Sequence, residues 1–343
     1  MQVKLSDLCN ITMGQSPKSI YYNKEGSGIP FMQGCTTFGR LFPSIDTWTT
    51  SYNKLANPND ILFTVRAPVG DINIALTNIA IGRGLAALKP TSVSTKYLYY
   101  LLLSNKELFT NNSSGTVYDS INKYNLENTI LNVHSYSNQL LIVDIIGSLD
   151  DKIENNNKII DKLWQKLQLA HTDFKSKNEL VEKNILELAD IKYGKGIPTS
   201  EILKDGLYSV YGSNGIIGYL NNYTFKEHKI AISCRGNSSG IIHLTDENST
   251  VTSNSLVLDF KNFDYTYYFF LEFMYKGLYE YKTGSAQPQI TIDNLKILNL
   301  QVPKNINDYI KNINDSVEYT FCLKKENQKL FLLKQFYLKK FFG

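Results

Sequence analysis

The sequence resembles itself when it is shifted by about half its length, and this internal repeat constrains the fold more than any other feature. Five pairs of segments follow one another in the same order in the two halves of the chain. They are LSDLCNITMG (5–14) and ILELADIKYG (185–194), ILFTVRAPVGDI (61–72) and IAISCRGNSSGII (230–242), STKYLYYLLL (94–103) and DYTYYFFLEF (264–273), SSGTVYDSIN (113–122) and TGSAQPQIT (283–291), and ILNV (130–133) and ILNLQVP (297–303). A single pair would be unremarkable among α/β proteins, but the ordered set predicts two similar domains.

Each half of the repeat ends in a segment that favours a long helix. No proline or glycine occurs between 148 and 183, and Ser148 with Asp151 is a suitable N-cap pattern. A heptad seam is formed by Ile153, Asn156, Ile160, Leu163, Leu167, Ala170 and Phe174. We expect a helix of roughly 50 Å, since each residue adds about 1.5 Å.

The segment 316–343 repeats this pattern, with Leu323, Leu330, Leu333 and Tyr337 on one face. Each helix could simply pack on its own domain as an ordinary surface helix. The length and the seam favour antiparallel pairing of the two helices with each other instead.

These features predict an α+β chain with two pseudo-repeated α/β recognition domains separated by two long antiparallel coiled-coil helices. The length of 343 residues fits two domains and their connectors. We place the first domain at 1–147, the central helix at 148–184, the second domain at 185–303 and the distal helix at 304–343.

Composition narrows the class of protein without identifying it. The net charge of +4 is compatible with nucleic-acid binding but does not indicate it. No run of about 18 apolar residues and no apolar signal-peptide core occurs, so we expect a cytoplasmic protein. The four cysteines form no CxxC pair and the four histidines are scattered, so we expect reduced thiols and no metal site.

The sequence lacks the motifs of the enzymes that modify or cleave DNA. No proline is followed by another, which excludes the paired-proline turn that holds a flipped adenine in methyltransferases. The glycine-rich segment 211–218 has the spacing of a turn rather than of a cofactor loop, and no Walker phosphate loop occurs. Glu227-His228-Lys229 resembles part of a nuclease site but lacks an acidic partner, and we interpret it as an exposed charged turn. The chain is predicted to be non-catalytic.

The order of half-repeat, long helix, half-repeat and long helix resembles the specificity subunits of type I restriction-modification systems. The segment SLDDKIENNNKIIDKLWQKL (148–167) looks like the central conserved helix of that family, and KKENQKLFLLKQFYLKKFF (324–342) is similar to its distal helix. The openings LSDLCNITMGQSP and LADIKYGKGIP look like the starts of its two target recognition domains. The chain also resembles the compact specificity subunits that serve fused methyltransferase–nuclease enzymes, and the sequence does not separate the two.

The resemblance implies a DNA-binding subunit that reads a bipartite target and recruits methyltransferase subunits, with or without a helicase–nuclease restriction subunit. It implies that S-adenosylmethionine binds to the methyltransferase and that this chain carries no cofactor. The alternative is a repeat protein that binds carbohydrate or protein, for which the 23 tyrosines could provide aromatic platforms. Affinity that falls steeply with salt would favour DNA.

Sequence readers in the major groove are best made from arginine, asparagine and glutamine, whose forked groups can form two hydrogen bonds to a base. Loops at equivalent places in the two repeats are rich in such residues, although turn-forming residues have the same composition. Arg66 and Arg235 rank first because each follows a strand at an equivalent place, the alternative for each being a salt bridge to a nearby carboxylate. The candidate DNA contacts are Gln33, Thr36, Thr37, Arg40, Arg66, Arg83, Tyr118, Asp119 and Ser120 in the first domain, and Tyr211, Ser213, Asn214, Arg235, Asn237, Ser238, Asn254, Gln287 and Gln289 in the second.

Overall fold

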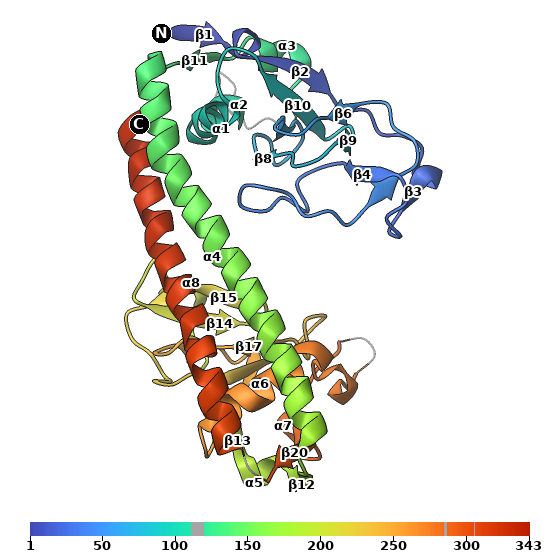
Figure 1. The fold of residues 1–343 in the computed structure, drawn as a ribbon, viewed down its shortest axis with the longest axis vertical. Helices are drawn as coiled ribbons and strands as arrows, with labels where there is room; N and C mark the ends of the chain where they lie inside the picture. The colour runs from blue at the N-terminus through green and yellow to red at the C-terminus, as the bar shows by residue number, and fades with distance from the viewer. Residues whose placement is uncertain (111–119, 285–286, 305) are drawn as a thin grey trace. The chain divides into compact units, whose positions relative to one another are not determined.

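The computed structural model describes residues 1–110, 120–284, 287–304 and 306–343 (Figure 1). The chain forms two compact units. Unit 1 comprises Met1–Glu154 and Gln328–Gly343, and unit 2 comprises Asn155–Asn327.

Unit 1 is built on a four-stranded antiparallel sheet in the order β2-β10-β7-β8. The strands are β2 (Cys9–Met13), β10 (Leu85–Pro90), β7 (Ile61–Thr64) and β8 (Ile72–Ile74). Helix α1 (Thr95–Ser104) follows β10 and is capped by Ser94, whose side chain accepts a hydrogen bond from the Tyr97 amide. Alternate residues of β7 enter different cores: Ile61 and Phe63 pack with α1, whereas Leu62 packs on the opposite face.

The remaining elements of unit 1 cover this sheet and its ends. A second sheet, in the order β3-β5-β4-β9-β6, supplies the core on the face opposite α1. Its strands are β3 (Tyr22–Asn23), β5 (Trp48–Thr49), β4 (Ile29–Met32), β9 (Ile79–Ile81) and β6 (Leu55–Ala56). The other elements are the pair β1 (Gln2–Lys4) and β11 (Ile130–Asn132), the short helices α2 (Glu107–Thr110) and α3 (Lys123–Glu127), and the 3₁₀ turns Leu5–Asp7 and Ser19–Tyr21.

Unit 2 repeats the central sheet of unit 1 strand for strand. Its order is β13-β19-β16-β17, again antiparallel, and helix α6 (Asp264–Lys276) again follows the second strand. The strands are β13 (Ala189–Tyr193), β19 (Ser255–Phe260), β16 (Ile230–Ser233) and β17 (Ile242–Leu244). The internal repeat predicted from the sequence is therefore confirmed as a repeat of structure.

The outer elements of unit 2 correspond to those of unit 1 in part. The strands β12 (Leu180–Asn184) and β20 (Asn299–Pro303) pair as β1 and β11 do. The second sheet differs, with three strands in the order β15-β14-β18. These are β15 (Gly215–Leu220), β14 (Tyr208–Gly212) and β18 (Thr250–Val251), and the short helices are α5 (Ile185–Leu188), α7 (Ile292–Leu295) and the 3₁₀ turns Thr199–Glu201 and Tyr279–Tyr281. The segment 211–218 belongs to the β14–β15 hairpin, and the turn predicted there is confirmed at Ser213 and Asn214.

Both long helices exist, and the central one begins earlier than the sequence suggested. Helix α4 spans Tyr136–Lys177, and α8 spans Asn307–Phe342. Ser148 does not cap α4, because its hydroxyl donates to the Ile145 carbonyl inside the helix. The helix continues through Gly147, at a cost of about 1 kcal/mol, because Ile142 and Ile146 are buried in the unit 1 core. It ends at Lys177 rather than near 183, since the residues of β12 pair with β20.

The predicted antiparallel pairing of the two helices is confirmed within each unit. In unit 2, the side-chain amide of Asn156 donates to the side chains of Glu326 (2.8 Å) and Asn327 (2.9 Å), while Phe174 stacks on Tyr309 with ring centres 4.1 Å apart. The seam positions Asn156, Ile160 and Leu167 are buried. Later residues of α4 therefore contact earlier residues of α8, as antiparallel pairing requires.

In unit 1, the predicted face of the distal helix is wrong by one position. Leu333 is 41% exposed, whereas Lys334 and Leu338 are buried. Lys334 takes the inward position because its ammonium group lies 2.7 Å from a carboxylate oxygen of Asp150, which is itself buried. The helix pair of unit 1 thus encloses a charged pair where the sequence pattern suggested leucine.

None of the helices in the described part of the chain is long and apolar enough to span a membrane.

Candidate nucleic-acid interface

In unit 1, Arg66 stands where three segments of the chain meet at one end of the central sheet. Strands β2 and β7 terminate on this side of the sheet, and β10 begins there. The Val65 amide donates to the Gly84 carbonyl (2.9 Å), and the Ile121 amide donates to the Val65 carbonyl (2.9 Å). The backbone beside Arg66 is therefore fixed on both sides, with Arg83 next to one bond and Ser120 next to the other.

Unit 2 builds the same junction around Arg235. The Cys234 amide donates to the Asn254 carbonyl (3.0 Å), and the Ile290 amide donates to the Cys234 carbonyl (3.0 Å). Isolated antiparallel bridges join Arg235 to Gln289 in unit 2 and Arg66 to Ser120 in unit 1. The two arginines are thus equivalent in hydrogen bonding as well as in sequence.

A glycine at the end of the first sheet strand brings a neighbouring loop close to each junction. The amide of Gly14 donates to the Leu85 carbonyl (2.8 Å), and that of Gly194 donates to the Ser255 carbonyl (3.0 Å). A Cβ atom on Gly14 would lie 2.1 Å from the Gly82 carbonyl oxygen, and one on Gly194 would lie 2.3 Å from that of Thr252. Only glycine permits this approach, which explains why it ends the first segment of both repeats.

Both junction arginines present their side chains to solvent. Arg66 and Arg235 are exposed, and neither forms an ion pair with a carboxylate in the part of the chain that the structure describes. The salt-bridge alternative therefore gains no support for either residue. An exposed guanidinium on a rigid backbone suits recognition of a planar two-acceptor edge such as that of guanine.

The other predicted residues of unit 1 differ in whether they belong to this junction. Gln33 and Arg83 are exposed, and both belong to it, because the Gly82 amide donates to the Met32 carbonyl (2.8 Å) and the Arg83 amide to the Ser16 hydroxyl (3.1 Å). Ser120 is exposed and bridges to Arg66. Thr36 and Thr37 lie in the loop that follows β4. Tyr118 and Asp119 lie outside the described residues.

Arg40 is a correction to the predicted set. Its guanidinium lies 3.2 Å from Asp150 and 5.4 Å from the centre of the Phe331 ring, while its backbone carbonyl accepts a hydrogen bond from the Tyr99 hydroxyl. Because Asp150 is 1% exposed, releasing Arg40 toward a base would remove one partner of a buried charge. Arg40 therefore belongs to the helix-packing network and not to the reading surface.

In unit 2, hydrogen bonds gather most of the predicted polar residues around Arg235. The Ser213 hydroxyl donates to the Asn254 carbonyl (3.4 Å), and the Ser238 hydroxyl donates to the Asn214 side chain (2.5 Å). The Asn237 carbonyl accepts a bond from the Lys282 ammonium group (3.5 Å). The side chains of Asn237, Asn254, Gln287 and Gln289 are exposed.

Tyr211 is the second correction. Its ring is 6% exposed and packs with Phe225, Val251 and Val257, and its hydroxyl accepts a hydrogen bond from the Asp246 amide (3.1 Å). Burial, followed by the charge of Asp246, raises the pKa of Tyr211 above its usual value. The hydroxyl is occupied and the ring is covered, so Tyr211 supports the surface from beneath.

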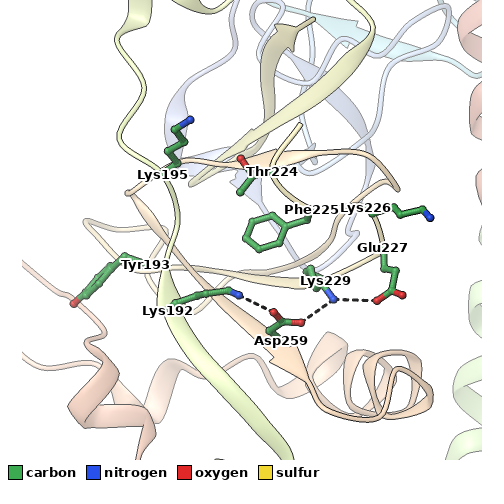
Figure 2. Close-up of a pocket in the computed structure, with 9 residues that line it drawn as sticks. All are labelled: Lys192, Tyr193, Lys195, Thr224, Phe225, Lys226, Glu227, Lys229 and Asp259. Atoms are coloured by element: carbon green, nitrogen blue, oxygen red, sulfur yellow. Dashed lines mark hydrogen bonds and ion pairs between the residues drawn. The ribbon is translucent and has the colours of Figure 1, made fainter. Parts of the chain in front are cut away.

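A basic pocket beside the unit 2 junction was not predicted. Figure 2 shows Lys192, Lys195, Lys226 and Lys229 around the ring of Phe225, with Asp259 and Glu227 between lysines. The interpretation of Glu227-His228-Lys229 as an exposed turn is wrong, because His228 and Lys229 are buried and Lys229 pairs with both Glu227 and Asp259. The repeat did not reveal the pocket, since the residue equivalent to Lys195 in unit 1 is the uncharged Gln15.

No group of metal-binding side chains occurs among the residues that the structure describes. The described thiols of Cys9, Cys35, Cys234 and Cys322 are all free.

Comparison with known proteins matches this architecture to one family. The family model for the type I restriction modification DNA specificity domain matches residues 1–165 and 177–334. The putative type I restriction enzyme MjaX specificity subunit of Methanocaldococcus jannaschii is 39% identical over 150 residues, which cover 43% of this chain and 35% of that protein. A putative type I specificity subunit of Mycoplasma pneumoniae is 25% identical over 214 residues, which cover 57% of this chain and 56% of that protein. The matches thus span between one third and just over half of these relatives' lengths.

Among solved structures, the type I restriction-modification S subunit from M. genitalium has a TM-score of 0.63 at 19% identity and covers 100% of this chain and 96% of its own. This likeness confirms the predicted α+β fold with its repeated domains and long helices. The family description is one of DNA specificity rather than of catalysis. Because the family model covers nearly all of the sequence in two consecutive segments, the chain belongs to the type I restriction-modification DNA specificity family.

Proposed function

We propose that this chain binds DNA in a sequence-specific manner and reads a bipartite target, one half with unit 1 and the other with unit 2. The observation that carries the proposal is the equivalence of Arg66 and Arg235. Both are exposed, both lack a carboxylate partner among the described residues, and both are held by the same backbone hydrogen bonds. A bidentate contact from arginine to guanine contributes about 1–3 kcal/mol of discrimination against another base.

The two junctions differ in the side chains around these arginines, and this difference supports two distinct half-sites. Unit 1 places Gln33 and Arg83 near Arg66, whereas unit 2 places Asn254 and Gln289 near Arg235. Arginine prefers guanine, whereas asparagine and glutamine prefer adenine. We expect unit 2 to accept more adenine in its half-site than unit 1.

In this proposal the partner subunits, and not this chain, carry out catalysis. The chain would recruit methyltransferase subunits, and in a complete system a restriction subunit, to the sequence it has bound. S-adenosylmethionine would bind to the methyltransferase rather than to this chain. A DNA-binding protein with such partners would act in the cytoplasm.

The experiment is selection from a pool of random DNA duplexes by the full-length chain at moderate salt. We expect enrichment of two short sequences separated by a gap of constant length whose bases are not selected. Enrichment of a single uninterrupted sequence would contradict the bipartite reading. Binding without enrichment, or affinity that is indifferent to salt, would contradict sequence-specific DNA recognition altogether and would favour a carbohydrate or protein ligand.

A further inference from the structure

The basic pocket of unit 2 is the strongest charged feature that the reading junction does not use. It has a volume of about 420 Å³ and is lined by residues of β13 and β19, by Lys195 and by the segment 224–229 that precedes β16, with Phe225 in its wall (Figure 2). The ammonium group of Lys192 lies 5.3 Å from the centre of the Phe225 ring. Four of the nine residues that line the pocket are lysines.

The negative charge inside the pocket is already neutralised. Lys229 lies 2.7 Å from Asp259 and 3.3 Å from Glu227, and Lys192 lies 2.6 Å from Asp259. Although burial favours the protonated form, hydrogen bonds from Lys192 and Lys229 hold the pKa of Asp259 below its usual value. With two carboxylates against four lysines, the pocket keeps a net charge of +2.

This surplus is located on Lys195 and Lys226. Both side chains are exposed, and neither makes an ion pair with any described residue. In Figure 2 they stand on either side of Phe225, away from the Asp259 network. Two exposed ammonium groups at the rim of one opening favour an anionic ligand that extends across it.

The backbone connects this rim to the arginine junction. The Lys195 amide donates to the Val251 carbonyl (2.8 Å), and the Ser253 amide donates to the Lys195 carbonyl (3.1 Å). Ser253 precedes Asn254, whose carbonyl accepts the bond from Cys234 beside Arg235. Lys195 therefore lies two strands from Arg235, or about 10 Å at the usual strand spacing. The major groove is about 12 Å wide. A side chain that contacts a base in the groove and a side chain that contacts a phosphate at its edge are therefore separated by a distance similar to that between Arg235 and Lys195.

We propose that this pocket, through Lys195 and Lys226, binds backbone phosphates of the DNA that flanks the half-site read by unit 2. The inference rests on the proposed function, because the ligand is the DNA that the chain recognises. The matching registers of β2 with β10 and of β13 with β19 place the uncharged Thr12 and Gln15 of unit 1 at the positions of Lys192 and Lys195. The phosphate contact is thus a property of the second domain and makes the two halves of the interface unequal.

The test compares the full-length chain with the variant K195Q/K226Q on a duplex that carries the selected target and on a scrambled duplex. A matched control, K296Q/K304Q, removes two exposed lysines of unit 2 that pair with Asp293 and Glu179. Dissociation constants are measured by fluorescence anisotropy between 50 and 200 mM salt. Each lost phosphate contact reduces the slope of log affinity against log salt by about 0.9, so the wild type should lose roughly 12-fold more affinity over this range than K195Q/K226Q.

The expected result is a weaker, less salt-dependent K195Q/K226Q variant whose preference for target over scrambled duplex is unchanged, beside a control that behaves as the wild type. A salt slope equal to that of the wild type, or an equal loss in the control, overturns the inference. A changed preference also overturns it, because the lysines would then read bases. If the wild type itself shows no preference for its selected target, the proposed function fails, and this outcome does not depend on the lysines.

Discussion

The buried charge pair between Asp150 and Lys334 provides a stringent test of how the helices of unit 1 are held together. Asp150 is 1% exposed and Lys334 is 3% exposed. The carboxylate also accepts a hydrogen bond from the Tyr100 hydroxyl (2.8 Å) and lies 3.2 Å from Arg40. The perturbations are Lys334→Met, which keeps the length of the side chain, and Asp150→Asn, which keeps its shape.

Removal of one partner from a buried ion pair costs about 3–5 kcal/mol, because the other charge is left without compensation. Lys334→Met should fall at the lower end, about 3 kcal/mol, since Asp150 retains Arg40 and Tyr100. Asp150→Asn should cost more, because Lys334 would then be buried without a counter-charge. The double variant D150N/K334M should be less destabilised than the sum of the singles by about 2–3 kcal/mol, as expected for groups in direct contact.

The assay is urea unfolding followed by fluorescence. Of the two tryptophans, Trp48 lies in unit 1 and Trp164 in unit 2, so a W164F background common to all variants leaves a reporter in unit 1. Lys96→Met is the matched control, because Lys96 pairs at 2.7 Å with the exposed Asp151 and should contribute less than about 1 kcal/mol. If the two single variants are additive, or if Lys334→Met is as mild as Lys96→Met, the reasoning is refuted.

Two further predictions concern unit 2. A hydrogen bond from His171, followed by the ammonium group of Lys175, lowers the pKa of Glu272 to about 2, although burial opposes the shift. The carboxylate therefore stabilises the fold above pH 4.5, and this contribution, at most about 3 kcal/mol, is lost as the pH falls toward 2. In urea unfolding the stability of Glu272→Gln should decline less steeply over this range than that of the wild type, and parallel curves would contradict the assignment. Gly194→Ala should destabilise unit 2 by about 1–3 kcal/mol and weaken DNA binding, because its Cβ would lie 2.3 Å from the Thr252 carbonyl oxygen. Gly196→Ala, whose Cβ would have no neighbour within 4 Å, is the control; equal effects in thermal melts would show that the close approach is unimportant.

The repeated architecture was predictable because the same residue types recur wherever the sheet needs them. Gly14 and Gly194 sit where a carbonyl leaves no room for a Cβ atom, and Arg66 and Arg235 follow strands whose apolar residues are buried. These requirements are local, so the same residue types recur at the same places in the two halves of the sequence. The start of α4 was not predictable from local signals, since burial of Ile142 and Ile146 outweighs the preference of Gly147 for a helix end.

The errors at individual residues come from contacts between distant segments. Lys334 is buried only because Asp150, far away in sequence, faces it, and the same carboxylate draws Arg40 away from the reading surface. Tyr211 looks like a loop residue in the sequence, but its hydroxyl is bonded to the Asp246 backbone and its ring is covered. The acidic partner that Glu227 and Lys229 lacked in sequence is Asp259, which the strand pairing of β16 with β19 supplies.

The most direct test of the two-reader account is a comparison of Arg66→Ala with Arg235→Ala in the same selection from random duplexes. Each substitution should cost about 1–3 kcal/mol at the base that the arginine reads. We predict that Arg66→Ala relaxes the selected bases in one half of the target only and that Arg235→Ala relaxes them in the other half only, with the gap length unchanged. If both variants relax the same half, or if neither alters any selected base, the claim that the two units read separate halves of one target is wrong.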